Sequence, residues 1–276
     1  MVGVLGMNKL VNKYGGWALI TGASQGIGKG FARRLAKEGF NLVMTARRTD
    51  VLEASANELR DEFGVETRTL ALDMTQTGAI EQLKSFVADI EIGFLVNNVA
   101  FSKPAPFFSL SDENLGKQIY CNVEVVARLS SHFGKKMQER DRGAIINVSS
   151  RTGEIAMPYF AMYCATKSFI SILTESLWFE LKDTNVDVLV VKPDQTATEG
   201  YLSKSPTIWG DEGIQTVEDC IDESFSALGQ YAGWLTWPKS RDDVKNLRAM
   251  PLEEAISING EGMLSVFTEQ LQLDNS

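Results

Sequence analysis

The sequence predicts an α/β fold in which helices cover both faces of a doubly wound parallel sheet. Apolar strand-like runs alternate with stretches of helical periodicity between residues 17 and 191. The runs themselves, such as Val188-Leu189-Val190-Val191, are continuous and do not alternate with polar residues. Strands of this kind are buried on both faces. Strict alternation of strands and helices then produces a parallel sheet with helices on its two sides.

Each expected element has a local signal. The expected strands are 17–21, 40–45, 66–72, 94–96, 144–148 and 186–191. The expected helices are 27–38, 50–63, 75–90, 111–137, 158–181 and 217–228. Gly39 and Gly64 mark helix ends, Ser111 is a candidate N-cap, and Pro158 suits a first helical turn. The order of these elements supports the doubly wound sheet.

The domain organisation follows from length and from where the alternation stops. With 276 residues the chain is long enough for one domain with a sizeable core, and we expect a single domain over 1–276. After residue 192 the regularity ends, so 194–215 is expected to be a loop with short helical pieces that covers the substrate. Residues 230–276 form a C-terminal extension whose structure the pattern does not predict.

The composition excludes several classes of function. The net charge of -9 and the pI of about 4.9 argue against general binding of nucleic acid or anionic membranes. Three well-separated cysteines show no metal spacing and no disulfide framework, which fits a reducing cytoplasm. No run of about 18 apolar residues occurs, so no membrane span is expected. The chain reads as a cytoplasmic protein without a metal site.

A glycine-rich turn follows the first strand and opens the first long helix. Such a turn brings backbone N–H groups close to a pyrophosphate, as in Rossmann-type folds. The candidate cofactor-binding residues here are Gly22, Ser24, Gln25, Gly26, Ile27 and Gly28. The alternative is a tight turn without a ligand. Its position after the first strand of a strand–helix alternation favours dinucleotide binding.

The end of the second strand indicates which dinucleotide is bound. NAD sites usually carry a carboxylate about 20 residues after the glycines, but Arg47 and Arg48 stand here. A guanidinium suits a 2′-phosphate, so NADP(H) is expected and NAD(H) is less favoured. The alternative is that both arginines are solvated. Asp73 and Met74, after the third strand, are expected near the adenine, although Asp73 could instead cap the next helix.

Ser150, Tyr163 and Lys167 form the sharpest chemical signal. Tyr163 and Lys167 are four residues apart on one predicted helix and therefore share a face. A neighbouring lysine is expected to lower the pKa of the phenol, which suits a general acid or base. Ser150 follows a strand at the carboxyl edge of the sheet and is placed to stabilise a carbonyl oxygen that gains negative charge. Taken singly, each residue also has a structural interpretation.

Together these motifs resemble the short-chain dehydrogenase/reductase family over about residues 15–200. The resemblance rests on the glycine turn at 21–28, Asn97-Asn98, Asn122, Ser150 and Tyr163-Cys164-Ala165-Thr166-Lys167. It implies that Tyr163 donates or accepts the proton, Ser150 polarises the substrate oxygen, and Lys167 binds the nicotinamide ribose. It also implies that Asn122 holds a relay water. Asn98, Pro193, Thr196 and Thr198 complete the implied cofactor set.

A closer resemblance is to the 17β-hydroxysteroid dehydrogenase/3-ketoacyl-CoA reductase branch. It rests on Tyr14-Gly15-Gly16-Trp17, Val65-Glu66-Thr67-Arg68-Thr69 and Ile92-Gly93-Phe94-Leu95-Val96-Asn97-Asn98-Val99. Ala100 and Asp194 depart from the pattern, because relatives usually have glycine at both positions. The resemblance also implies a homodimer or homotetramer, with 111–137 and 158–182 at the subunit interface.

The expected function is therefore an NADP(H)-dependent carbonyl reductase or alcohol dehydrogenase acting on a bulky apolar ketone or alcohol. Apolar residues expected around the cleft favour such a substrate: Phe101, Phe107, Phe108, Met157, Phe160, Tyr201, Ile208 and Trp209. The alternatives are a 3-ketoacyl thioester reductase and a non-catalytic dinucleotide sensor. A serine hydrolase is disfavoured. It would need a histidine beside Ser150, but the single histidine, His132, lies on the long helix predicted at 111–137, and no nucleophile elbow is present.

Overall fold

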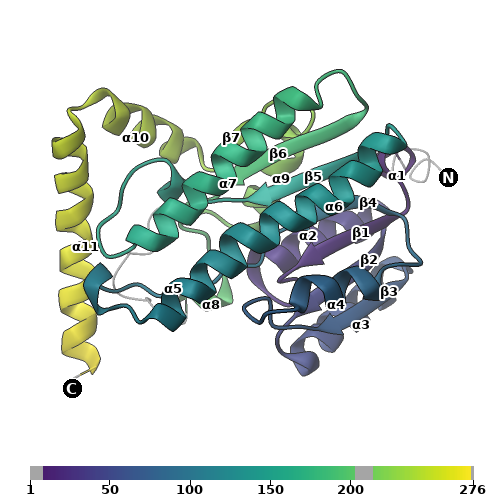
Figure 1. The fold of residues 1–276 in the computed structure, drawn as a ribbon, viewed down its shortest axis with the longest axis horizontal. Coiled ribbons are helices and arrows are strands. Elements are labelled where there is room, and N and C mark those ends of the chain that lie inside the picture. Colours follow the sequence, from purple (N-terminus) through teal and green to yellow (C-terminus); the bar gives the residue numbers. More distant parts are fainter. Residues whose placement is uncertain (1–8, 203–213, 275–276) are drawn as a thin grey trace.

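The computed structural model describes residues 9–202 and 214–274 and confirms the predicted fold class. A seven-stranded sheet has the order β3-β2-β1-β4-β5-β6-β7, and every paired strand is parallel to its neighbour (Figure 1). The strands are β1 Trp17–Thr21, β2 Asn41–Ala46, β3 Thr67–Ala71, β4 Ile92–Asn97, β5 Gly143–Val148, β6 Val186–Lys192 and β7 Gly233–Leu235.

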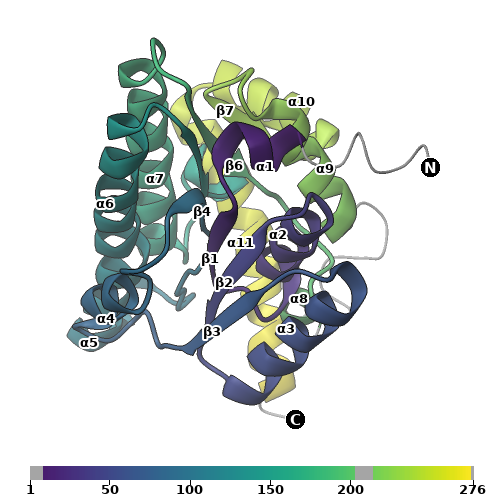
Figure 2. The same ribbon diagram turned by 90° about the vertical axis from the view of Figure 1, so that its right-hand side faces the viewer.

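Helices cover both faces of this sheet (Figure 2). One layer contains α2 (Gly26–Lys37), α3 (Thr49–Phe63) and α9 (Val217–Ala227), and the opposite layer contains α4 (Ala79–Phe86), α6 (Val125–Glu139) and α7 (Ala161–Glu180). Strand residues alternate between the two cores: Ile20 packs on the α2 side, and Leu19 packs on the α6 side. Burial on both faces explains the continuous apolar strands.

The sheet has a topological switch point between β1 and β4. Ile20 of β1 pairs with Met44 of β2 on one side and with Val96 of β4 on the other. After β1 the chain enters α2, and after β4 it runs towards the opposite layer (Figure 2). Open α/β sheets bind ligands in the crevice that such a divergence leaves at the carboxyl ends of the strands. Most of the predicted site residues follow the carboxyl ends of β1 to β6, and the others, Asn122, Tyr163 and Lys167, lie in helical segments.

The long helix predicted at 111–137 is present but is not uniform. It consists of α5 (Asp112–Ile119), a π-helical turn (Tyr120–Glu124) and α6, which continues to Glu139. The hydroxyl of Ser111 accepts a hydrogen bond from the backbone N–H of Asn114 at 3.2 Å, so the predicted N-cap is confirmed. π-Helical turns are frequent at functional sites, and this one contains Asn122.

The helix predicted at 158–181 begins later than expected, and the placement of Pro158 in its first turn is wrong. Tyr159 has a φ of 66°, which is the left-handed region that bulky residues rarely adopt. This conformation interrupts the helical path, so α7 starts at Ala161. The helix predicted at 75–90 is also shorter, because turns precede Gly78, whose φ is 91°, and α4 starts at Ala79.

The C-terminal extension continues the fold. Strand β7 adds to the sheet edge beside β6, and α10 (Pro238–Ala249) and α11 (Leu252–Asp274) follow (Figure 1). The short helix α8 (Glu199–Leu202) is one of the helical pieces expected within 194–215, whereas the short helix α1 (Lys9–Tyr14) had no expected counterpart. A strand of three residues is too short to show a periodicity. Across residues 9–202 and 214–274, no helix combines the length and the apolar character needed to cross a membrane.

Candidate active site

The glycine turn is held against β4 by Asn98 and Thr21. The side-chain amide of Asn98 donates to the carbonyl oxygens of Thr21, at 3.0 Å, and Gly22, at 3.1 Å. The Thr21 hydroxyl accepts from the backbone N–H groups of Asn98, at 3.0 Å, and Val99, at 3.1 Å. These bonds join the loops on both sides of the switch point. Thr21 was not among the candidate site residues, and its place at the end of β1 was the available signal.

The glycines of this turn are required by its geometry. A Cβ atom on Gly28 would lie 2.1 Å from the carbonyl oxygen of Gly22, so no larger residue fits without moving the turn. Gly26 has a φ of 53°, and a Cβ there would lie 2.9 Å from Cγ2 of Thr198. Thr198, from the loop after β6, therefore lies directly against the turn. The backbone at the start of α2 stays open to a close-approaching anion.

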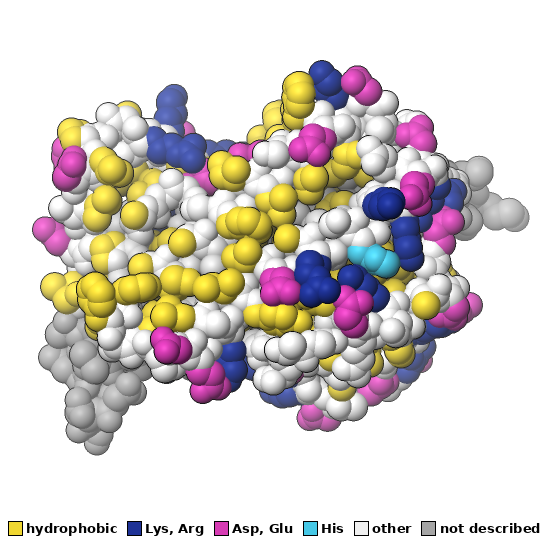
Figure 3. All heavy atoms as spheres, in the orientation of Figure 1, with side chains coloured by type: hydrophobic (Ala, Val, Ile, Leu, Met, Phe, Trp, Pro, Cys, Tyr) yellow, Lys and Arg dark blue, Asp and Glu magenta, His cyan; other side chains and the backbone are white. Residues whose placement is uncertain are grey.

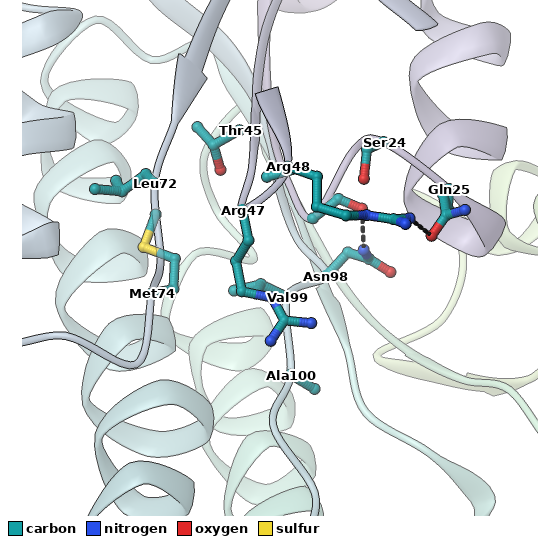
Figure 4. Close-up of a pocket in the computed structure, with 12 residues that line it drawn as sticks. Ser24, Gln25, Thr45, Arg47, Arg48, Leu72, Met74, Asn98, Val99 and Ala100 are labelled. Carbon is teal, nitrogen blue, oxygen red and sulfur yellow. Dashed lines mark hydrogen bonds between the residues drawn. The ribbon is translucent and has the colours of Figure 1, made fainter. Parts of the chain in front are cut away.

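A cavity of about 300 Å³ lies beside this turn (Figure 4). Seven of the predicted cofactor-binding residues line it: Gly22, Ser24, Gln25, Arg47, Arg48, Met74 and Asn98. Ala100, which replaces a glycine expected by resemblance, also lines it and adds a methyl group to the wall. Thr45, Ala46, Leu72 and Val99 complete the lining without having been singled out in the sequence. The lining residues lie at or just after the carboxyl ends of β1 to β4, so only the fold brings them together.

The two arginines have different settings. The guanidinium of Arg48 donates a hydrogen bond to the side-chain oxygen of Gln25. The Arg47 side chain extends from the end of β2 towards Ala100 (Figure 4), and among the described residues it forms no ion pair. The cavity lining contains no Asp or Glu. Against the effect of burial, hydrogen bonds from Thr75 and Gln76, followed by the Arg47 charge, lower the pKa of the nearby Asp73 carboxyl. The glycine turn and the Arg47 guanidinium together fit a dinucleotide that carries an extra phosphate.

Asp73 uses its carboxylate locally. One carboxylate oxygen accepts hydrogen bonds from both the backbone N–H and the hydroxyl of Thr75, each at 2.9 Å. Asp73 does not line the cavity, whereas its neighbour Met74 does. Contact of Asp73 with the adenine stays a prediction, and its observed role is to order the turn that precedes α4.

Ser150, Tyr163 and Lys167 come together at the end of β5. The Lys167 ammonium donates a hydrogen bond of 2.8 Å to the carbonyl oxygen of Val148, and it lies 5.4 Å from the centre of the Tyr163 ring. Ser150 is the second residue after β5 and forms a side-chain hydrogen bond with Tyr163. Ser149 braces the same loop, because its hydroxyl donates to the carbonyl oxygen of Lys167 at 2.7 Å.

The pKa values in this cluster are governed by burial. Burial raises the pKa of the Tyr163 phenol to about 12, and the hydrogen bond with Ser150 opposes this rise. Burial also lowers the pKa of the Lys167 ammonium to about 8. The expected lowering of the Tyr163 pKa by Lys167 stays a prediction, because burial dominates the pKa of the phenol in this structure. The phenol is protonated at neutral pH and is set to donate its proton.

Asn122 clamps the loop after β4. Its side-chain oxygen accepts from the backbone N–H of Phe101, and its amide donates to the carbonyl oxygen of the same residue, both at 2.8 Å. The amide also donates to the hydroxyl of Thr166 at 3.1 Å. The fully buried side chain thus links the π-helical turn, the β4 loop and α7. Holding a relay water stays a prediction for this residue.

The loop after β6 reaches the same region. The Pro193 carbonyl accepts a hydrogen bond from the backbone N–H of Arg151 at 2.8 Å, and Thr198 touches the glycine turn. Thr196 is buried and pairs with Gln215 in an isolated bridge. Of the segment predicted to cover the substrate, residues 194–202 and 214–215 are described. Ile208 and Trp209 lie outside the described residues.

The apolar residues expected around the cleft are not equally placed. The Phe160 ring lies 6.3 Å from the Tyr163 ring. Phe107 and Phe108 are 42% and 99% exposed, so they are not part of the protein core. The Tyr201 hydroxyl is buried without a hydrogen-bond partner in the part of the chain described. Of these residues, only Phe160 is shown beside the catalytic cluster, through its contact with Tyr163.

Comparison with known proteins identifies the family. The family model for short chain dehydrogenases matches residues 16–207. The chain belongs to this family. As a short-chain dehydrogenase it is an oxidoreductase of CH–OH and C=O groups, and the family uses a nicotinamide dinucleotide. The family resemblance inferred from the motifs is therefore confirmed.

Individual relatives support the same assignment. The short-chain dehydrogenase is 33% identical over 249 residues to the 7β-hydroxysteroid dehydrogenase of Collinsella aerofaciens, covering 89% of this chain and 95% of that protein. It is 36% identical over 198 residues to the human very-long-chain 3-oxoacyl-CoA reductase, covering 70% of this chain and 64% of that protein. A structure solved in a study of 7β-hydroxysteroid dehydrogenase stereoselectivity superposes with a TM-score of 0.87 at 33% identity, covering 91% of this chain and 98% of that one.

Proposed function

We propose that this short-chain dehydrogenase is NADP(H)-dependent and interconverts a ketone and a secondary alcohol on a bulky apolar substrate of the hydroxysteroid class. Tyr163 acts as the general acid and base, and Asn122, Ser150 and Lys167 complete the catalytic set. A homodimer or homotetramer in the cytoplasm is the form that we expect. The cofactor preference, the proton chemistry and the substrate class are supported by separate observations.

The single observation that carries the cofactor assignment is the setting of Arg47. Its guanidinium extends into a cavity beside the glycine turn, without a carboxylate in the lining (Figure 4). An adenosine 2′-phosphate placed there would meet a planar cation suited to paired, charge-assisted hydrogen bonds. An NAD-specific site would instead offer a carboxylate to the ribose. When bound, the nicotinamide would supply or accept the hydride.

The proton chemistry rests on Tyr163 and Ser150. The protonated phenol donates its hydrogen to the substrate oxygen as the carbonyl becomes an alcohol, and it takes this proton back in the reverse direction. The Ser150 hydroxyl, hydrogen-bonded to Tyr163, stabilises the negative charge that develops on the same oxygen. Lys167 holds its ammonium between Tyr163 and the Val148 carbonyl, where it favours the deprotonated phenol during return of the proton.

The substrate class is supported by the relatives and by the apolar surroundings of the cleft. The relative that this chain covers almost completely is a 7β-hydroxysteroid dehydrogenase. A second candidate, reduction of a 3-ketoacyl thioester, is favoured by the similarity to the 3-oxoacyl-CoA reductase over 198 residues. A non-catalytic sensor has less support, because it would not require Ser150, Tyr163 and the buried Lys167 to lie together.

The oligomer is supported by the outer face of α7. Hydrophobic side chains gather across the face formed by α6 and α7 (Figure 3). On α7, Ile172 is 65% exposed and Phe179 is 60% exposed. Exposed apolar patches of this kind are typical of subunit interfaces. The sequence resemblance implies the same two helices as the interface.

The test is a titration with NADPH and with NADH, followed by nicotinamide fluorescence, of the unmodified protein and of Arg47→Asp. We expect the unmodified protein to bind NADPH more tightly, and the variant to lose or invert this preference. Lys245→Asp, an exposed position on α10, makes the same change in net charge and should leave the preference unchanged. Equal affinity of the unmodified protein for both dinucleotides, or a preference for NADH that Arg47→Asp leaves unchanged, would reject NADP(H) specificity.

Turnover of ketosteroids and 3-ketoacyl thioesters with the preferred dinucleotide then separates the two substrate classes. A higher kcat/KM for the ketosteroids is the expected result. Binding of NADPH without turnover of any ketone in either class would support the sensor instead.

A further inference from the structure

The strongest unexplained feature of the site is a partly buried carboxylate beside the Ser150 loop. Asp194 follows Pro193 after β6, and its side chain is 14% exposed. One carboxylate oxygen accepts a hydrogen bond of 2.6 Å from the hydroxyl of Ser240, which is fully buried in the first turn of α10. The same oxygen lies 3.4 Å from Nε of Arg151. Asp194 therefore touches two segments that are remote from it in sequence.

Arg151 connects this carboxylate to the catalytic loop. It is the residue after Ser150 and begins a short helical turn, Arg151–Gly153, for which Ser150 is the N-cap. The Ser150 hydroxyl accepts a hydrogen bond from the backbone N–H of Thr152 at 3.2 Å. The Arg151 backbone N–H is held by the Pro193 carbonyl, and its side chain is held by Asp194. The position of Ser150 thus depends on its neighbour Arg151, whose backbone and side chain are both held in place.

The negative charge of Asp194 holds the Arg151 side chain in place. Nε of Arg151 is buried and forms no hydrogen bond among the described residues. The Asp194 carboxylate oxygen lies 3.4 Å from this atom, and its negative charge balances the positive charge of the guanidinium. The Arg151 side chain is 20% exposed, and a partly buried cation that loses its counter-charge is destabilised and moves towards water. The carboxylate also lies at the N-terminal turn of α10, where the helix dipole favours a negative group. Loss of the charge would release Arg151 and with it the turn that carries Ser150.

We propose that Asp194 is a positioning residue for the reaction: its carboxylate, anchored by Ser240 of α10, holds Arg151 so that the Ser150 hydroxyl stays aligned with Tyr163. The proposal rests on the proposed function, because it assigns a role in that same site. A purely structural role, in which Asp194 only attaches α10 to the loop, is a different explanation. A second contact between α10 and the loop allows the two roles to be separated. Arg248 of α10 forms an ion pair with Glu154, whose side chain is 4% exposed.

The test compares Asp194→Asn, Ser240→Ala and the matched control Arg248→Gln, with kcat, KM, NADPH affinity and Tm measured for each. Asp194→Asn keeps an acceptor for Ser240 but removes the charge that faces Arg151. We expect kcat to fall about tenfold, the size of effect that modest misalignment produces, with NADPH affinity changed less than about twofold. Ser240→Ala should lower kcat by a smaller factor, because the carboxylate remains but loses its anchor.

The pairwise connection is tested by Arg151→Gln alone and together with Asp194→Asn. If Asp194 acts through Arg151, the double variant should be no slower than the slower single variant, because the effects of coupled residues do not add. The control Arg248→Gln should reduce Tm without the fall in kcat. An unchanged kcat in Asp194→Asn, or an equal fall in Arg248→Gln, would overturn the proposal.

Amide hydrogen exchange gives a readout that needs no substrate. Asp194→Asn should speed exchange in the peptide covering residues 149–157 relative to the unmodified protein, while Arg248→Gln should affect α10 first. If the unmodified protein fails to turn over any ketone, the proposed function fails, and the exchange rates still decide the positioning role. Unchanged exchange at 149–157 in Asp194→Asn would reject it.

Discussion

The Lys167 ammonium is anchored to the Val148 carbonyl oxygen at 2.8 Å, and this bond ties α7 to the last residue of β5. Lys167 is 2% exposed, so the bond replaces water that the ammonium has lost. It also sets the ammonium 5.4 Å from the Tyr163 ring. The same contact therefore serves the packing of α7 on the sheet and the geometry of the catalytic cluster.

Lys167 should make stability depend on pH above neutrality. Its pKa is lowered by burial to about 8 from the usual 10.5, so between these values the unfolded chain holds more protons than the folded chain. Folding stability gained from this group therefore rises with pH across that window. Relative to Lys167→Met, the unmodified protein should gain about 3 kcal/mol between pH 7.5 and pH 10.5.

Urea unfolding of both proteins at several pH values measures this gain. Lys245→Met, on the exposed side of α10, is the control and should show a constant difference from the unmodified protein. A constant difference for Lys167→Met as well would contradict the prediction.

Tyr163→Phe should abolish most of the turnover while preserving cofactor binding. The substitution removes only the hydroxyl that hydrogen-bonds Ser150 and supplies the proton. General acid catalysis contributes about 10²- to 10⁴-fold to the rate, so kcat should decrease by at least about 10²-fold. Single-turnover rates with NADPH, together with a fluorescence titration, measure the two effects. Tyr231→Phe, at a half-exposed ring stacked on Trp234, should leave kcat unchanged. A kcat that survives Tyr163→Phe would remove the phenol from the mechanism.

Asn122→Ala should destabilise the protein as well as inactivate it. The substitution leaves the N–H and the carbonyl of Phe101 without the two side-chain partners that they have at 2.8 Å. Loss of partners for such groups costs about 1–3 kcal/mol, and chemical unfolding should show a decrease of about that size. Asn246→Ala, on an exposed position of α10, should change stability by less than about 0.5 kcal/mol. Equal stability for Asn122→Ala and the unmodified protein would show that the clamp is not maintained in solution.

Gly28→Ala should eliminate dinucleotide binding without unfolding the sheet. A methyl group at this position would lie 2.1 Å from the Gly22 carbonyl oxygen, so the turn must open. We expect NADPH affinity to fall at least about tenfold, because the backbone groups of the turn no longer converge on one anion. Gly116→Ala is the matched control, since a Cβ there meets no atom within 4 Å. It should keep NADPH affinity and increase stability by up to about 1 kcal/mol. Unaltered NADPH binding by Gly28→Ala would place the dinucleotide elsewhere.

The sequence could predict the elements whose signals are local and long. The strands β1, β2, β4, β5 and β6 are nearly continuous apolar runs, and α2 and α3 end at glycines, so their types and approximate bounds follow from composition alone. Errors occurred where a backbone conformation overrode the pattern. Tyr159 at a φ of 66° delays α7, and three-residue β7 is stabilised by pairing with β6 and not by its own propensity.

The candidate site also has features that the sequence predicts and features that only the tertiary structure sets. The spacing of Tyr163 and Lys167 and the glycine turn could be read directly, because residues close in sequence fix each other's geometry. The burial that sets the pKa of Lys167 to about 8 and of Tyr163 to about 12 depends on β5, α7 and the loops packed around them. No sequence pattern carries that information.

By itself the sequence determined the fold class, the family and the residue types available for hydride and proton chemistry. Only the tertiary structure decided that Asn122 clamps Phe101, that Arg47 faces the cavity while Arg48 pairs with Gln25, and that Asp194 meets Arg151 and Ser240. The reason is physical. Local propensity and periodicity act over a few residues, whereas burial, charge compensation and hydrogen bonding in the site arise between segments that are far apart in the sequence, and only the folded sheet brings these segments into contact.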